Sequence, residues 1–134
     1  MSNQSLLGKR VLITQADMFM GPILCDVFAE HGATVIESTD PLSSAGAPAA
    51  VITEAGHVDV LLANLAIPAP TTVATAVTEE EWHDTFAALV HPLSRLFRAV
   101  LPAMIERRAG KILVMGSASA LRSGVAGRAG RGRA

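Results

Sequence analysis

The residues best placed for chemistry lie in one turn, between Thr14 and Gly21. The turn follows a short apolar segment, residues 10–14, and precedes a segment with helical spacing. In nucleotide-binding α/β proteins such a turn is rich in glycine, because only glycine lets the backbone approach a pyrophosphate closely. Here Gly21 is present, but Phe19 stands two positions before it. The turn is therefore where a dinucleotide would bind, and its side chains are predicted to fill the space that a dinucleotide needs.

The elements around this turn predict a βαβ unit. Residues 10–14 form an apolar run typical of a buried strand, and a helix is expected from Pro22 to Gly32, with apolar residues at helical spacing. A second strand is expected over residues 33–37. A strand, a helix and a strand in this order are nearly always joined in a right-handed, parallel arrangement.

Further segments extend the alternating pattern. A short helix is expected over residues 49–55, a buried strand over residues 59–63 and another strand over residues 111–116. The stretch between Glu37 and Val58 is too short for both the helix and the strand that a complete nucleotide-binding half has there. We therefore expect a shortened region after the second strand.

Two helices are expected between the last two strands. Residues 78–81, Thr-Glu-Glu-Glu, form a capping box at the start of the first helix. His91-Pro92 ends that helix and begins the second, which is apolar over a wide arc and is expected to kink at Pro102. We expect this second helix to be covered by other elements or by another subunit. The first helix is expected to pack one apolar stripe: Trp82, Phe86 and Leu89.

Composition excludes several classes of protein. The chain has 134 residues, 50% hydrophobic and 17% charged, with a net charge of −1, which is typical of one globular domain and not of a nucleic-acid-binding surface. Cys25 is the one cysteine, so an internal disulfide or a cysteine-based metal cage is impossible. The polar N-terminus does not resemble a signal peptide, and residues 86–105 are judged too polar for a membrane span. A cytoplasmic protein without membrane or nucleic-acid partners is expected.

Residues 8–121 together resemble the N-terminal half of a short-chain dehydrogenase/reductase. The resemblance implies a Rossmann-like, three-layer α/β/α fold with a parallel sheet, incomplete because only that half is represented. Residues 1–121 are thus interpreted as a partial domain, and residues 122–134, largely Gly, Ala and Arg, as a disordered tail. Five stretches carry the resemblance in the family's order and spacing: residues 8–14, 57–64, 80–82, 98–104 and 110–117.

Several positions depart from the family's pattern. The glycines of its turn would stand at the positions of Gln15 and Phe19. Its Asn-Asn-Ala-Gly motif is replaced by residues 63–66, Ala-Asn-Leu-Ala, and His91 stands where an Asn usually begins a helix. These departures argue against a bound nicotinamide dinucleotide.

One branch of the superfamily, the halohydrin dehalogenases, shares such changes. Its turn has Thr, four residues, an aromatic residue, one residue and Gly, and this spacing is matched by Thr14, Phe19 and Gly21. Residues 90–93 and 116–120 also resemble one subgroup. The resemblance implies an enzyme without a cofactor, in which a halide site with Phe19 in its wall replaces the dinucleotide. Asn64 is a further candidate for the wall of this pocket.

The chemistry implied is an intramolecular displacement. A Tyr takes the hydroxyl proton of a vicinal haloalcohol, the alkoxide attacks the neighbouring carbon, and halide leaves; the reverse reaction opens an epoxide with a small anion. By position, Ser117 is the serine that holds the substrate oxygen. The Tyr and its basic partner would stand at Gly130 and Ala134, and the chain contains no Tyr. The chain is therefore interpreted as a fragment that is itself inactive.

Alternative functions remain open at this point. One is an NAD(P)-dependent oxidoreductase, in which Glu37 or Asp40 would bind a ribose hydroxyl. Another is a non-catalytic truncated product that pairs with intact subunits through the helix over residues 93–104. The full-length family implies a homo-oligomer.

Individual residues also have simpler interpretations. Phe19 could be a core residue at a helix entry, and Ser117 could cap the turn after a strand, with Ser119 as the competing hydroxyl. Asn64 could satisfy loop backbone. His91 is expected to be structural, because no second metal ligand stands four residues on.

Overall fold

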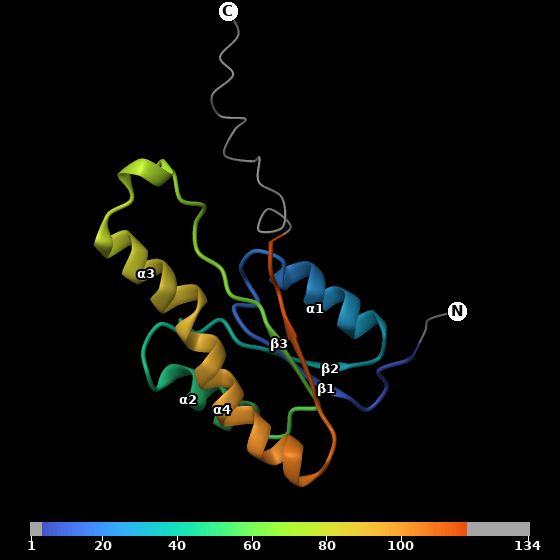
Figure 1. Cartoon of the computed structure of the whole chain (residues 1–134). Helices are drawn as coiled ribbons and strands as arrows, with labels where there is room; N and C mark the ends of the chain where they lie inside the picture. The colour runs from blue at the N-terminus through green and yellow to red at the C-terminus, as the bar shows by residue number, and fades with distance from the viewer. Residues whose placement is uncertain (1–3, 118–134) are drawn as a thin grey trace, which may run out of the picture.

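A parallel β-sheet forms the centre of the computed structural model, which describes residues 4–117 (Figure 1). Within these residues the sheet has four strands in the order β2-β1-β3-β4, and every neighbouring pair is parallel. The sequence prediction of a parallel βαβ unit is confirmed. The strands are β1 (Arg10–Ile13), β2 (Thr34–Glu37), β3 (Val60–Ala63) and β4 (Lys111–Val114).

Helices cover both faces of the sheet, which gives the expected three layers (Figure 1). Helix α1 (Gly21–Glu30) packs on one face, where Cys25 meets Val11 and Ile13 of β1. Helices α2 (Ala47–Ala55) and α4 (His91–Glu106) pack together on the other face. Helix α3 (Glu79–Leu89) precedes α4, and the short 3₁₀ helix η1 (Ala74–Ala76) lies before α3.

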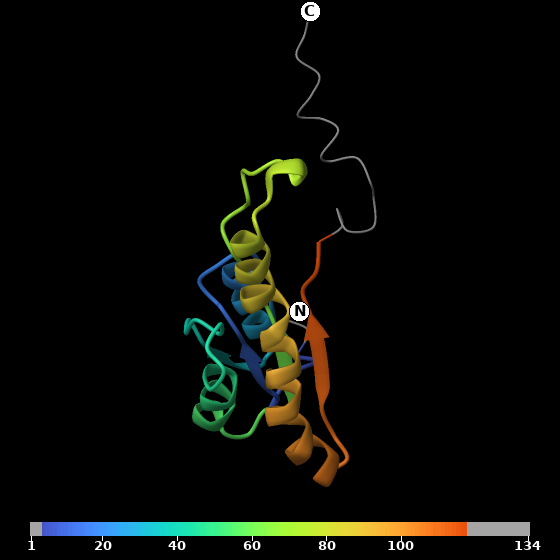
Figure 2. The ribbon, with the colours of Figure 1, turned by 60° about the vertical axis from the view of Figure 1, so that its left-hand side comes forward.

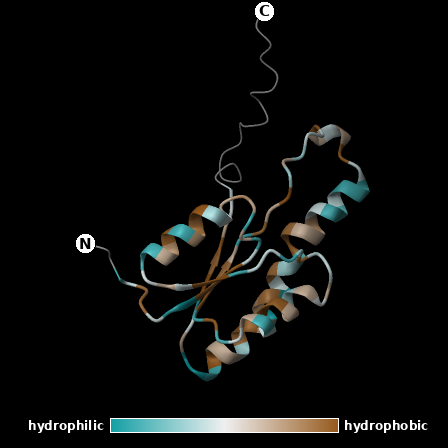
Figure 3. Cartoon of the chain, turned by 180° about the vertical axis from the view of Figure 1, so that it is seen from behind, coloured by the Kyte–Doolittle hydropathy of each residue, from teal (hydrophilic) through white to brown (hydrophobic). Residues whose placement is uncertain are grey.

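The two central strands are buried on both faces because they are continuous apolar runs. In β1, Leu12 faces α2 and α4, whereas Val11 and Ile13 face α1. The three side chains are fully buried, as expected for a parallel strand between two helical layers. Figure 3 shows the hydrophobic residues concentrated in the strands and on the inner sides of the helices. Replacing such a core Leu by Ala typically costs about 2–5 kcal/mol of stability.

The shortened region after β2 contains a helix but no strand. Helix α2 is the one regular element in it, and β2 is one edge of the sheet as described in residues 4–117. The sequence prediction that this stretch cannot hold both elements is confirmed.

The capping box at α3 is present with both hydrogen bonds. The Glu81 N–H donates to Thr78 Oγ1 (3.1 Å), and the Thr78 N–H donates to Glu81 Oε2 (2.9 Å). The hydroxyl of Thr72 also donates to Glu81 Oε1 (2.6 Å). These donors, Thr72 first, hold the pKa of the Glu81 carboxyl below its usual value.

The expected packing of the α3 stripe is wrong for Trp82. Trp82 is 57% exposed, and its ring lies tilted against that of Phe86, with ring centroids 5.0 Å apart. Helix α3 buries none of its residues, Glu79–Leu89, because it extends beyond the end of the sheet (Figure 2). Amphipathic spacing therefore placed the stripe on one face, but the described part of the chain has no element to cover it.

Helix α4 is covered on one side. Leu96, Val100 and Met104 are buried against the sheet and α2, whereas Ile105 is exposed. The helix is continuous through Pro102, and the predicted kink there stays a prediction.

By length and composition alone, the helical stretch Glu79–Glu106 could cross a membrane. The sequence judgement that this region is too polar for a span is therefore not upheld on composition. Core helices of soluble proteins pass the same test, and α4 buries one face in the core, so the finding is weak evidence for a span. The predicted tail over residues 122–134, and the positions of Ser119, Gly130 and Ala134, lie outside the described residues.

The edge strand β4 predicts self-association. Its apolar residues Leu113 and Val114 are 42% and 48% exposed, although strands of this composition are normally buried, and Figure 2 shows β4 along one open side. We expect Leu113→Lys to shift the chain from aggregates toward monomer, measured by sedimentation velocity. The matched variant Val73→Lys, at an exposed loop position, should change the distribution little. Equal effects of the two variants would show that added charge, and not the strand edge, controls solubility.

Asp59 ties the start of β1 to the start of β3 and makes stability depend on pH. The Arg10 N–H donates to Asp59 Oδ2 (2.9 Å) and His57 Nε2 lies 3.0 Å from Oδ1, so the pKa of the carboxyl is lowered, mainly by the Arg10 amide. A lowered pKa in the folded state adds stability above the unfolded pKa, and this stability is lost as the pH falls through the folded value.

We expect Asp59→Asn to lower the free energy of unfolding at pH 7 by about 1 kcal/mol. The difference should shrink as the pH falls below the ordinary pKa of an Asp carboxyl, about 3.9, and toward the lowered pKa of Asp59 in the folded state. Urea unfolding across this pH range measures it. Asp84→Asn, at an exposed position on α3, is the control. A pH-independent difference between wild type and Asp59→Asn would contradict the role of the ionised carboxylate.

Candidate functional site

The turn after β1 keeps the backbone of a glycine-rich turn without its glycines. Gln15 (φ 44°) and Phe19 (φ 51°) are both left-handed, and they are the two positions where the resembled family has glycine. A side chain in this conformation costs about 1 kcal/mol or more, because its Cβ crowds the backbone. Other contacts must therefore hold the turn in place.

Gly21, the glycine that remains, is required by close packing. A Cβ added there would lie 2.3 Å from the carbonyl oxygen of Ala16, so the start of α1 presses directly on the preceding turn. Ala16 is itself held by its N–H, which donates to the Ser38 carbonyl after β2 (2.9 Å). Gly21 thus allows the chain to reverse tightly between β1 and α1.

Thr14 and Asn64 brace the turn from inside. Both are fully buried. The Thr14 hydroxyl donates to the Asn64 carbonyl (2.9 Å), and Asn64 Nδ2 donates to the carbonyls of Gln15 and Met18 (2.9 Å each). Neither side chain lines the cavity described below, so the interpretation of Asn64 as a residue that satisfies loop backbone is the one that the geometry supports.

Gln15 makes a contact that sequence reasoning missed. Its Nε2 donates to the Ala66 carbonyl (3.3 Å), and the Ala66 N–H donates to its Oε1 (2.6 Å). The side chain therefore satisfies both polar groups of one residue in the loop after β3. Only the identity of Gln15 at a glycine position hinted at such a role.

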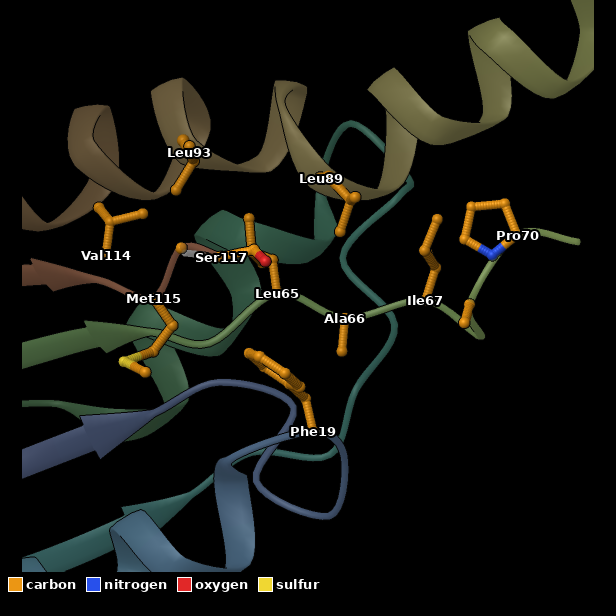
Figure 4. A pocket seen from close by; sticks show the side chains of 12 residues that line it. Phe19, Leu65, Ala66, Ile67, Pro70, Leu89, Leu93, Val114, Met115 and Ser117 are labelled. Carbon is orange, nitrogen blue, oxygen red and sulfur yellow. The ribbon is translucent and has the colours of Figure 1, made fainter. Parts of the chain in front are cut away.

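A cavity of about 490 Å³ opens at the carboxyl ends of β1, β3 and β4 (Figure 4). This is the edge at which ligands bind in open α/β sheets. Phe19 enters it from the turn after β1, and Ser117 enters it after β4, so the structure brings these two predicted residues together. The remaining walls are mainly apolar: Leu65, Ala66, Ile67, Ala69, Pro70, Leu89, Leu93, Val114, Met115 and Gly116.

His91 lies outside this cavity. It is exposed at the start of α4, where its ring stands 6.3 Å from the ring of Phe86. Among residues 4–117 no group of three His, Cys, Asp or Glu side chains could hold a metal ion. His91 therefore takes no part in this cavity, and its structural role stays a prediction.

A second cavity, of about 420 Å³, lies at the carboxyl end of β2. Glu37 and Asp40 both line it, together with Ser38 and Thr39. An acidic residue at this place is what a ribose hydroxyl requires in a dinucleotide-binding protein. This end of the crevice is therefore compatible with the nicotinamide alternative.

The turn itself does not fit a pyrophosphate. The Gly21 N–H at the start of α1 already donates to the Met18 carbonyl (2.8 Å), and Pro22 has no N–H. Phe19, 60% exposed, projects where the backbone of a dinucleotide-binding turn must lie open. The first turn of α1 thus lacks donors that normally hold the phosphates.

We expect Gly21→Ala to lower the free energy of unfolding by about 2 kcal/mol, because the new methyl group would overlap the Ala16 carbonyl. Denaturant titration measures the loss. Gly116→Ala, where nothing lies within 4 Å of the added Cβ, should change stability by less than about 0.5 kcal/mol. Equal stability of the two variants would show that the turn can relax around a side chain at position 21.

Comparison with known proteins points to one family. Residues 36–129 match the family model described as short chain dehydrogenase. The 3-oxoacyl-[acyl-carrier-protein] reductase FabG of Vibrio cholerae is 29% identical over 138 aligned positions, covering 84% of this chain and 56% of that protein. FabG of Escherichia coli is 27% identical, with 82% and 55% covered. The chain thus spans about half the length of the curated relatives it matches.

Solved structures are similar over nearly the whole chain. A protein described as a dehalogenation enzyme is 26% identical, with a TM-score of 0.77, covering 87% of this chain and 57% of that one. A 3-oxoacyl-[acyl-carrier protein] reductase with bound NAD from Brucella melitensis has a TM-score of 0.80 at 22% identity, covering 92% and 58%. At that identity the second likeness supports the fold alone.

Proposed function

Because the chain belongs to the short-chain dehydrogenase family yet carries Phe19 at a glycine position, we propose that its cavity serves cofactor-free haloalcohol chemistry. The reaction class is the interconversion of a vicinal haloalcohol with an epoxide and halide. The observation that carries the proposal is the meeting of Phe19 and Ser117 in one apolar cavity. The similarity to a structure described as a dehalogenation enzyme supports it.

The cavity residues have distinct roles in this proposal. The hydroxyl of Ser117 donates a hydrogen bond to the substrate oxygen, and the apolar walls exclude water around the reacting carbons. The substrate hydroxyl loses its proton to a base, its oxygen forms the new C–O bond, and the C–halogen bond breaks with release of halide. Phe19 forms part of the wall against which the departing anion lies. Thr14, Gly21 and Asn64 maintain the turn that presents Phe19.

The base is the part that this chain does not supply. The chain contains no Tyr, so the proton acceptor implied by the resemblance is not one of its side chains. A general base contributes about 10²–10⁴-fold to such a rate. We therefore propose that these 134 residues bind the substrate class but do not turn it over.

Independence from nicotinamide is also part of the proposal. It rests on the missing phosphate donors at the start of α1 and on Phe19. The alternative is an NAD(P)-dependent reductase, favoured by Glu37 and Asp40 at the end of β2 and by relatives that are named reductases. A cytoplasmic location and a homo-oligomer, to which exposed Leu101 and Ile105 on α4 could contribute, remain proposals as well.

Binding to the full chain separates these two functions. We expect 1,3-dichloro-2-propanol to give saturation-transfer NMR signals that Ser117→Ala weakens and Ser44→Ala, in an exposed loop, leaves unchanged. NADH, followed by its fluorescence, should show no saturable binding up to about 1 mM. A dissociation constant of that size corresponds to a binding free energy of about −4 kcal/mol. Saturable NADH binding together with silence toward the haloalcohol would replace the proposal with the reductase alternative.

Turnover is measured in the same samples. Halide release from the haloalcohol should not exceed the background rate, for wild type or for Ser117→Ala. Release by wild type that Ser117→Ala abolishes would mean that another side chain of this chain acts as the base.

A further inference from the structure

Two loops form the sides of the crevice at the carboxyl edge of the sheet. One is the turn after β1, which carries Gln15 and Phe19, and the other is the loop after β3, which begins at Asn64. In an open α/β sheet a dinucleotide lies across this edge, so it has to pass between or over these loops. What joins the two loops therefore decides which ligands the crevice can accept.

The loops are joined by side-chain hydrogen bonds from both directions. Asn64 reaches into the turn and donates to two of its carbonyls, and Gln15 reaches out of the turn to the backbone of Ala66. The Ala66 N–H donates to Gln15 Oε1 at 2.6 Å, so Ala66 cannot move away from the turn without breaking this contact. Gln15 and Ala66 thus form a bridge that joins the two loops directly, without a bound ligand between them.

This bridge stands between cavities. Ala66 and Ile67 line both the main cavity with Phe19 and a smaller one of about 170 Å³. Gln15 lines the smaller cavity, whose other wall begins at Pro41, directly after Asp40 of the β2-end cavity. Ala66 and Ile67 thus form a partition, the wall shared by the Phe19–Ser117 cavity and the smaller cavity, and Gln15 holds this wall from the side of the smaller cavity.

We propose that Gln15 is a positioning and specificity-determining residue that divides the crevice and confines ligands to the Phe19–Ser117 cavity. The inference rests on the proposed function, because it explains how a cofactor-free cavity keeps its walls in place. The two hydrogen bonds between Gln15 and Ala66 fix the Leu65–Ala66–Ile67 wall relative to Phe19 without any bound group between them. The same side chain blocks the path from that cavity to Glu37 and Asp40.

The left-handed backbone at Gln15 is consistent with this role. A glycine would adopt φ 44° without cost, whereas Gln carries a steric penalty there. The two hydrogen bonds between its side chain and Ala66 offset that penalty. Phe19 carries the same kind of steric penalty and lines the main cavity from the turn after β1.

Amide hydrogen exchange tests the bridge without any ligand. In wild type the Ala66 N–H should be protected, and Gln15→Ala should lower its protection about tenfold, the effect of losing one hydrogen bond. Gln15→Glu keeps an acceptor for this N–H and should retain protection. Unchanged protection in a folded Gln15→Ala variant would overturn the bridge. Exchange at the Leu12 amide in β1 reports global stability. A variant that is only less stable would lose protection at Leu12 as well as at Ala66.

Ligand selectivity tests the partition. NADH fluorescence is titrated with Gln15→Gly, Phe19→Gly and the double variant, each combined with Pro22→Ala, which returns a backbone N–H to the first turn of α1. Glycine tolerates the left-handed backbone at positions 15 and 19. We expect saturable NADH binding below about 1 mM in the double variant and at least tenfold weaker binding in Phe19→Gly, where the partition remains. Binding to Phe19→Gly as tight as to the double variant, or no binding to a folded double variant, would overturn the partition.

The two proposals fail in different ways. If wild type binds no haloalcohol, the proposed function is lost, but the dependence of NADH binding on Gln15 still stands as a test of the partition. If wild type binds haloalcohol and the double variant gains no NADH binding, the proposed function survives and the partition does not.

Discussion

The turn, and with it the cavity, depends on the hydrogen bonds that the side-chain amide of Asn64 donates to it. The side chain is fully buried at the end of β3 and its Nδ2 donates to the carbonyls of Gln15 and Met18, while the backbone carbonyl of Asn64 accepts the Thr14 hydroxyl. Each of these two carbonyls also accepts a backbone N–H within the turn, from Met18 and Gly21 respectively, so the Asn64 side chain ties a turn that is already hydrogen-bonded to the end of β3. The left-handed residues Gln15 and Phe19 persist because the surrounding contacts leave the backbone no alternative.

Two side chains at strained positions distinguish this turn from the glycine-rich turn of a dinucleotide-binding protein. Glycines at positions 15 and 19 would give an open backbone surface next to α1, as a pyrophosphate needs. Gln15 and Phe19 keep the same backbone and place side chains in that space, one reaching the loop after β3 and one entering the cavity. The side chains of Gln15 and Phe19, and not the path of the backbone, therefore distinguish this turn from a glycine-rich one.

The strands that lead to the site residues differ in how deeply they are buried. Strands β1 and β3 are buried on both faces and deliver Thr14 and Asn64 at fixed positions, because their register is set by the continuous parallel ladder. Strand β4 delivers Ser117 but is half exposed, and α3, whose Leu89 joins the cavity wall, buries none of its residues, Glu79–Leu89. The loops that line the cavity after β1 and β3 thus leave well-buried strands, whereas the β4 and α3 side is thinly packed in the described part of the chain.

The sequence by itself determined the elements and much of the site, because these depend on local patterns. Continuous apolar runs predicted β1 and β3, the capping box predicted the start of α3, and the spacing of Thr14, Phe19 and Gly21 marked the turn. The exposure of Trp82 and the bridge from Gln15 to Ala66 were decided only by the tertiary structure. Residues 15 and 66 meet because β1 and β3 are adjacent in the sheet, and no periodicity along the chain reports which side chains two neighbouring loops bring together.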